Sequence, residues 1–87
     1  QQSKPEKISA KVASQERELI LFNDDINTFD FVIQTLIDVC EHEPEQAEQC
    51  AMIAHFKGKC GVKKGEFDVL KSRHFKMSIA GLTVEIL

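Results

Sequence analysis

Only three runs in this chain have the pattern of a β-strand, and none of them is longer than six residues: 18–23, 59–63 and 82–87. The segments between these runs carry apolar residues at intervals of three and four, the period of a helix with one buried face. Strands this short do not support a parallel, doubly wound sheet. The order strand, helix, helix, strand, helix, strand therefore predicts an α+β domain, with a three-stranded antiparallel sheet and three helices packed on one face.

End signals and apolar stripes define the three expected helices. Asn27 can cap the first helix, with Asp30 completing a box-like pair, and the second begins near Pro44 and stops at Gly58. The third helix covers 66 to about 80. The residues expected to face inward are, helix by helix, Phe29, Val32, Ile33, Leu36, Ile37 and Cys40; Ala47, Cys50, Ala51 and Ala54; and Phe67, Leu70, His74 and Met77.

The length of 87 residues leaves room for a single hydrophobic core. We expect residues 1–17, which are mostly polar, to be a flexible N-terminal extension and residues 18–87 to be the folded core. No run approaches the ~18 apolar residues that a membrane-spanning helix needs. Three cysteines are an odd number and too few for a disulfide framework. We therefore expect a reducing, cytoplasmic environment, a monomer, and cysteines that serve as small buried apolar residues.

Charge is strongly segregated along the chain. Residues 18–56 contain nine Asp and Glu but no Lys or Arg, whereas residues 57–76 contain seven Lys and Arg against two Asp and Glu. This pattern indicates one surface that receives a cation and another that meets a partner. The net charge of -3 and the lack of Trp and Tyr are not typical of a nucleic-acid-binding domain.

Signals for catalysis, metals and cofactors are weak. The glycines stand singly at the ends of elements, so no phosphate-binding loop is present and no cofactor is expected. Cys50 and His55 are five positions apart, which places them ~140° from each other around a helix and argues against joint metal ligation. Residue types alone make His55 a packed, hydrogen-bonded core histidine, and they give His42 and His74 no stronger functional signal. A small enzyme that uses Cys and His stays an alternative, but the expected burial of Cys40 and Cys50 argues against it.

The sequence Asn23-Asp24-Asp25 is the most informative polar segment. Such residues are ordinary in turns, because their short side chains bond back to the local backbone. Here, however, the turn precedes an apolar helix start and lies in the half of the chain without basic residues. A carboxylate, a carboxamide and an imidazole beside an apolar recess can hold an ammonium group while a large side chain fills the recess.

Two sequence blocks carry a family resemblance. LILFNDDINTFDFVIQTL and AEQCAMIAHFKGKCGV together resemble the ClpS adaptor family, and the likeness covers roughly residues 18–87. The pairing of N-D-D with the later histidine, aromatic and G-K block is far more specific than either block alone. The resemblance implies a fold related to the C-terminal domain of the ribosomal stalk protein. It also implies an adaptor, not an enzyme, that binds proteins with N-terminal Leu, Phe, Tyr or Trp and delivers them to a Clp-type AAA+ unfoldase.

The resemblance also implies roles for particular residues. By position, Asn23, Asp24 and His55 match the residues that bind the substrate's α-amino group, and Glu66 and Lys71 match residues that contact the unfoldase. The implied pocket residues are Asp25, Asn27, Phe29, Val32, Ala51 and Leu82. Ala51 stands where many members have Met, so we expect a wider pocket that accepts Ile or Val.

A second function class stays open beside this one. The related ribosomal stalk architecture binds protein factors through its helices without recognising an amine. The basic residues Lys57, Lys59, Lys63 and Lys64 could serve such an interaction. The acidic turn together with His55 distinguishes the two classes, because a stalk-type domain would not need them.

Overall fold

The computed structural model describes residues 15–87. The elements, in chain order, are β1 (Arg17–Phe22), α2 (Phe29–Cys40), α3 (Pro44–Lys57), β2 (Lys59–Gly65), α4 (Phe67–Ile79) and β3 (Thr83–Ile86). This order confirms the α+β domain predicted from the strand and helix patterns. The predicted extension, residues 1–17, lies outside the described residues except for its last three, and Arg17 is already part of β1.

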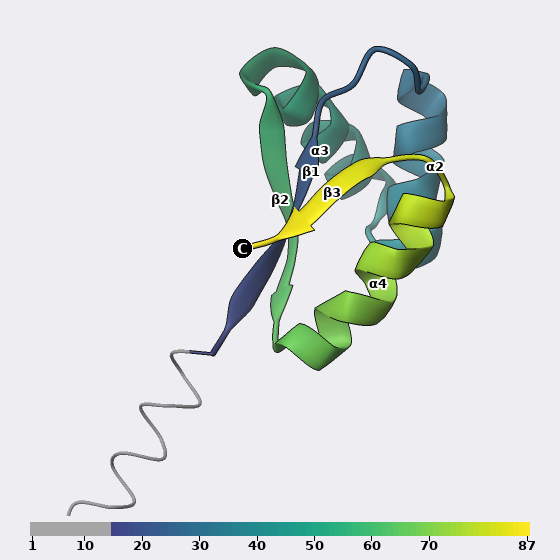
Figure 1. The fold of residues 1–87 in the computed structure, drawn as a ribbon. Helices are drawn as coiled ribbons and strands as arrows, with labels where there is room; N and C mark the ends of the chain where they lie inside the picture. Colours follow the sequence, from purple (N-terminus) through teal and green to yellow (C-terminus); the bar gives the residue numbers. More distant parts are fainter. Residues whose placement is uncertain (1–14) are drawn as a thin grey trace, which may run out of the picture.

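The three strands form one antiparallel sheet with the order β2-β1-β3. The central strand β1 pairs with both neighbours, so that Leu21 lies opposite Cys60 on one side and Val84 on the other. Figure 1 shows the helices gathered to one side of this sheet. The apolar run of β1 suits the centre of the sheet, whereas the lysines of β2 suit an edge, where charged side chains discourage pairing with another chain.

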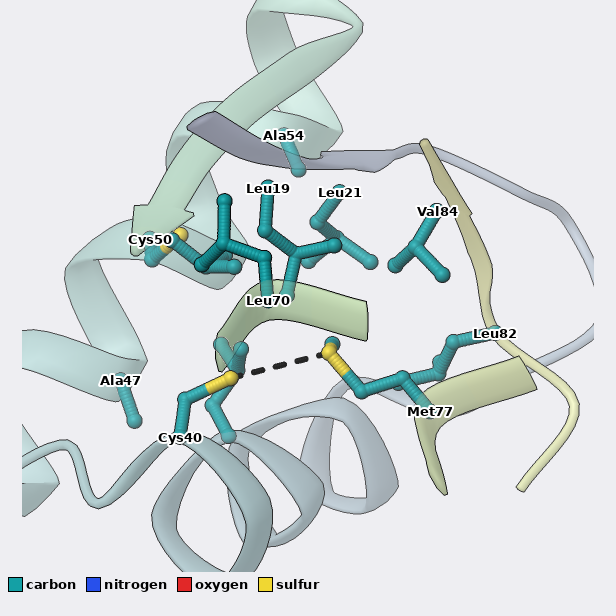
Figure 2. Close-up of a cluster of buried hydrophobic side chains, with 12 residues drawn as sticks. Leu19, Leu21, Cys40, Ala47, Cys50, Ala54, Leu70, Met77, Leu82 and Val84 are labelled. Atoms are coloured by element: carbon teal, nitrogen blue, oxygen red, sulfur yellow. Dashed lines mark hydrogen bonds between the residues drawn. The ribbon is translucent and has the colours of Figure 1, made fainter. Parts of the chain in front are cut away.

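The core lies between the sheet and the helices. Its largest fully buried side chains come from β1, α2 and α4: Leu19, Leu21, Leu36, Leu70 and Met77. The predicted inner stripe of α3 (Ala47, Cys50, Ala51 and Ala54) is buried throughout. In Figure 2 the sulfurs of Cys40 and Met77 meet across the bottom of this cluster, 3.6 Å apart. The small side chains of α3 let that helix approach its neighbours closely.

The structure corrects some of the local predictions. The N-cap of α2 is Thr28, whose hydroxyl accepts a hydrogen bond from the Phe31 N–H at 3.1 Å, and not Asn27, whose side chain is used elsewhere. Phe67 is 46% exposed, although its spacing predicted a buried position. It is the first residue of α4, two positions after the end of the edge strand β2, and nearly half of its side chain faces solvent there. His74 is half-buried, with Nε2 3.1 Å from the Val84 carbonyl oxygen.

His42 has a structural role that its sequence position did not indicate. The side chain is buried in the connection between α2 and α3, and its Nε2 donates to the carbonyl oxygen of Val62 at 2.7 Å. This bond ties the connection to β2. His42 Nδ1 is buried and has no hydrogen-bond partner among residues 15–87.

Candidate functional site

A pocket of about 340 Å³ opens between the β1–α2 connection and α3. Four segments line it: the end of β1, the loop that follows, the first turns of α2 and the second half of α3. The lining residues are Leu21, Phe22, Asn23, Asp24, Asp25, Asn27, Phe29, Val32, Ala51, Ala54 and His55. Its volume is at the small end of the range typical of small-molecule sites, ~300–1,000 Å³.

The loop on the acidic side of the pocket is held by the Asp24 carboxylate. Asp24 Oδ1 accepts hydrogen bonds from the backbone N–H groups of Ile26, at 2.9 Å, and Asn27, at 2.8 Å. Asp24 Oδ2 accepts a third, from Asn27 Nδ2, at 2.9 Å. This is the local side-chain-to-backbone bonding that the Asn and Asp residues predicted. The carboxylate is therefore held in place before any ligand arrives.

Two further bonds join this loop to distant parts of the fold. The Asn23 N–H donates to the carbonyl oxygen of Gly58 at 2.9 Å, next to the end of α3. Asn27 Nδ2 donates to the carbonyl oxygen of Gly81 at 3.0 Å, where a φ of 96° turns the chain from α4 into β3. Because the Asn27 side chain is bound to both Asp24 and Gly81, it stiffens the pocket wall, and Thr28 caps the helix instead.

The Asp24 carboxyl is set up to carry a negative charge. Partial burial acts to raise its pKa, but the hydrogen bonds from the Asn27 backbone and side chain and from the Ile26 backbone together hold the pKa below its ordinary value. A carboxylate has about four lone-pair sites, and the three bonds within the loop leave room for another donor. Asp24 can therefore accept a hydrogen bond from a cation in the pocket.

His55 lies at the opposite wall, in the last turn of α3. The side chain is exposed and contacts two aromatic rings edge-on: Phe29, with centroids 6.3 Å apart, and Phe56, at 4.8 Å. It makes no hydrogen bond to any other residue that the structure describes. The prediction of a packed, hydrogen-bonded core histidine, drawn from residue types, is wrong. Since no side chain or backbone group of residues 15–87 occupies its ring nitrogens, His55 can bind a ligand through either of them.

The rest of the pocket is apolar. Val32 is half-buried, Ala51 is buried, and Phe29 is 40% exposed at the side of the pocket that faces His55. The helical spacing of Phe29 predicted a core residue, but it belongs to the pocket wall because it is the first residue of α2. A bulky apolar group can enter here without displacing the core.

Three lining residues were missed by the sequence reasoning: Leu21, Phe22 and Ala54. Ala54 is three positions after Ala51 and directly before His55, so helical spacing could have placed it on the same face. Leu21 and Phe22 precede the acidic turn at the end of β1, but their pattern alone does not separate core from pocket.

Some predicted site residues lie elsewhere. Leu82 does not line the pocket: it is 5% exposed and belongs to the hydrophobic core, in the turn that leads from α4 to β3, where its backbone N–H donates to the Met77 carbonyl oxygen at 3.0 Å. Glu66, the N-cap of α4, and Lys71, on α4, are both exposed and outside the pocket. The structure thus brings together Asn23, Asp24, Asp25, Asn27, Phe29, Val32, Ala51 and His55.

The lining has the chemistry of a binding site for a cation with an apolar arm. It contains two carboxylates, two carboxamides and one imidazole, beside aliphatic and aromatic walls, and no lysine or arginine. Within residues 15–87, no group of three or more His, Cys, Asp or Glu side chains is placed to hold a metal ion. The helices of this described part are too short or too polar for one of them to cross a membrane.

Comparisons with known proteins point to one family. The family model described as "ATP-dependent Clp protease adaptor protein ClpS" matches residues 13–84. The chain is 34% identical over 58 residues to the ClpS adapter of Campylobacter jejuni strain 81-176, covering 64% of this chain and 60% of that protein. It is 38% identical over 50 residues to the ClpS adapter of Nitratidesulfovibrio vulgaris, covering 55% of this chain and 50% of that protein. The matches thus span at most 60% of the length of these two relatives.

A solved structure shares the fold. The structure of Agrobacterium tumefaciens ClpS2 bound to L-phenylalaninamide superimposes with a TM-score of 0.77 at 23% sequence identity. The alignment covers 84% of this chain and 95% of the other. At this identity, the likeness shows the fold alone and does not identify the ligand of this pocket.

Proposed function

Because this chain belongs to the ClpS family of ATP-dependent Clp protease adaptor proteins, we propose that it binds proteins with a bulky hydrophobic N-terminal residue and delivers them to a Clp-type AAA+ unfoldase for degradation. The observation that carries the proposal is the convergence of Asn23, Asp24 and His55 on one pocket with an apolar wall. We assign the protein to the cytoplasm as a monomer. In this scheme the adaptor itself hydrolyses nothing and needs no cofactor.

The polar side of the pocket suits an α-amino group. An α-ammonium has a pKa near ~8, so it is mostly charged at neutral pH and carries three N–H donors. Asp24 supplies a charged acceptor, the Asn23 side chain a carbonyl oxygen, and His55 a ring nitrogen. Hydrogen bonds between charged groups are about twice as strong as those between neutral groups. An acetylated amine loses both the charge and two of the donors.

The apolar side of the pocket suits the first side chain of the substrate. Burying a Leu or Phe side chain between Val32, Ala51 and Phe29 is worth roughly 1.5–3 kcal/mol, enough to separate it from Ala or Gly. The ligand named for the Agrobacterium ClpS2 structure, L-phenylalaninamide, combines a free amine with a large apolar side chain. That combination supports the same class of ligand for this pocket.

The contact with the unfoldase is proposed on α4. Glu66 and Lys71 are exposed there, and neither lines the pocket. Substrate and unfoldase can therefore be held at the same time. The family resemblance also implies a role in substrate delivery for the N-terminal extension, residues 1–17, which lies outside the described residues except for its last three.

Peptide titration tests the proposal directly. We expect fluorescent peptides that begin with Phe or Leu to bind at least ~10-fold more tightly than the matched Ala peptide, since ~1.4 kcal/mol corresponds to a tenfold change. An N-acetylated Phe peptide should lose most of this affinity. Equal binding of the acetylated and free peptides would overturn amine recognition and favour a protein-interaction module without it.

Ala51 is expected to set the width of the pocket. In Ala51→Met, the longer side chain should project into the pocket and crowd a β-branched ligand more than a linear one. We expect binding of an Ile-first peptide to fall about fivefold or more relative to a Leu-first peptide, the equivalent of ~1 kcal/mol of overpacking. Met52→Ala is the matched control, because Met52 is 45% exposed and does not line the pocket. An unchanged ratio of Ile to Leu binding in Ala51→Met would contradict this role.

A further inference from the structure

Two of the three cysteines touch each other, and the proposed function uses neither. The Sγ atoms of Cys50, on α3, and Cys60, on β2, are 2.8 Å apart. Cys40 stands apart from this pair, with its Sγ against Met77 Sδ. In Figure 2, Cys50 lies at the margin of the buried cluster, on the helix that also carries Ala47 and Ala54. Sequence reasoning treated all three cysteines as separate buried residues, but the fold pairs two of them.

The distance between the two sulfurs distinguishes two kinds of chemistry. Two thiolates on one tetrahedral zinc ion, each ~2.3 Å from the metal, lie ~3.8 Å apart. A disulfide needs ~2.05 Å, so these two sulfurs would have to close by only about 0.8 Å. No third metal-binding side chain joins them within residues 15–87. The pair is therefore suited to forming a disulfide and not to holding a metal ion.

We propose that Cys50 and Cys60 form a reversible disulfide that ties α3 to β2 when the protein meets a small-molecule disulfide such as oxidised glutathione. This modification site is separate from the peptide-binding function proposed above. Overall, two protein thiols and one glutathione disulfide give one protein disulfide and two glutathione thiols. The protein loses two electrons, glutathione gains them, and the two thiol protons end on the two released glutathione molecules.

Access favours Cys60 as the first sulfur to react. Its side chain is half-buried and lies along an open groove with Ile20, Ile53, Lys59 and Lys64. Three basic side chains and two acidic ones line this groove, and the basic excess favours the approach of an anionic reagent. The Cys60 thiolate attacks one sulfur of oxidised glutathione, which breaks that disulfide, forms a mixed disulfide and releases one glutathione.

Cys50 completes the reaction from inside the fold. Burial, together with the neighbouring Cys60 sulfur, raises the pKa of the Cys50 thiol, so that it reacts slowly with reagents in solution. Its contact with the Cys60 sulfur offsets this low reactivity, because the second step takes place within one molecule. After losing its proton, Cys50 attacks the Cys60 sulfur, forms the protein disulfide and releases the second glutathione.

Thiol counting and peptide mapping in glutathione redox buffers test this proposal. We expect oxidation of the wild type to remove two of its three thiols and mapping to link Cys50 with Cys60 in the monomer. Cys40→Ala should form the same link, whereas Cys50→Ala should carry only a glutathione adduct on Cys60. The oxidised wild type should also unfold at a higher urea concentration than the reduced protein, because the crosslink restricts the unfolded chain.

Other outcomes would overturn the proposal. These are three thiols that stay reduced, or adducts or intermolecular dimers without a Cys50–Cys60 link. Mapping of the wild type decides the matter even where a variant fails to fold. Peptide binding does not enter these readouts, so failure of the disulfide and failure of the proposed adaptor function can be told apart.

Discussion

Asp24→Ala is expected to weaken binding of a Phe-first peptide by about 10- to 150-fold, the equivalent of ~1.5–3 kcal/mol for a hydrogen bond to a charged group. The substitution removes the charged acceptor for the α-ammonium. It also removes the acceptor for the N–H groups of Ile26 and Asn27, so the loop loses the bonds that hold it in place. Fluorescence anisotropy titration measures the affinity, and circular dichroism checks that the variant is folded.

One further variant tests the charge while keeping most of the loop geometry, and another serves as a control. Asp24→Asn keeps an oxygen for the two backbone N–H groups, loses the bond from Asn27 Nδ2 and removes the charge, so we expect a substantial part of the loss to persist. Asp30→Ala is the matched control, since Asp30 is an exposed carboxylate in the first turn of α2 that does not line the pocket. If Asp24→Ala bound the peptide as tightly as the wild type, or if Asp30→Ala lost as much affinity, the site would be misplaced.

Leu70→Ala should reduce the free energy of unfolding by about 2–5 kcal/mol, because it removes a large side chain from a closed core and leaves a cavity. Leu70 is 0% exposed on α4 and belongs to the central cluster, where Figure 2 shows it between Cys50 and Met77. For a domain of this size, each ~1 kcal/mol lowers the melting temperature by roughly 4–8 °C. Urea unfolding measures the loss.

The preceding residue provides an internal control for this prediction. Val69 lies on the same helix but is 49% exposed, so Val69→Ala removes little buried surface and replaces a β-branched residue with a better helix former. We expect its urea midpoint to stay close to that of the wild type. Similar losses for the two variants would mean that α4 does not pack on the sheet through the face that carries Leu70.

Local signals predicted most of the fold. The small inner stripe of α3, its start at Pro44 and its stop at Gly58, with φ 97°, agree with the structure because each depends on neighbours within a few residues. The predicted N-cap of α2, Asn27, was wrong because of a contact between residues distant in the chain. Asn27 is a suitable cap by its chemistry, but its side chain is bound to Asp24 and to Gly81, which is 54 positions away.

The sequence alone predicted only part of the candidate site. The Asn and Asp residues of 23–25 predicted an acidic turn, because such side chains bond to their own backbone over two or three positions. The pairing of that turn with His55 came from a family resemblance, and residue types alone placed His55 in the core. The exposure of His55 depends on where the last turn of α3 lies relative to Phe29, which no short-range pattern contains.

The amino-acid sequence by itself determined the order and kind of the elements, the stiff acidic turn and the small face of α3, because these follow from backbone preferences and side-chain spacing over a few residues. Only the tertiary structure decided that Leu82 belongs to the core while Leu21 and Phe22 line the pocket, and that Cys50 meets Cys60. Those outcomes depend on how strands and helices distant in the chain pack together, and that packing is a property of the whole domain.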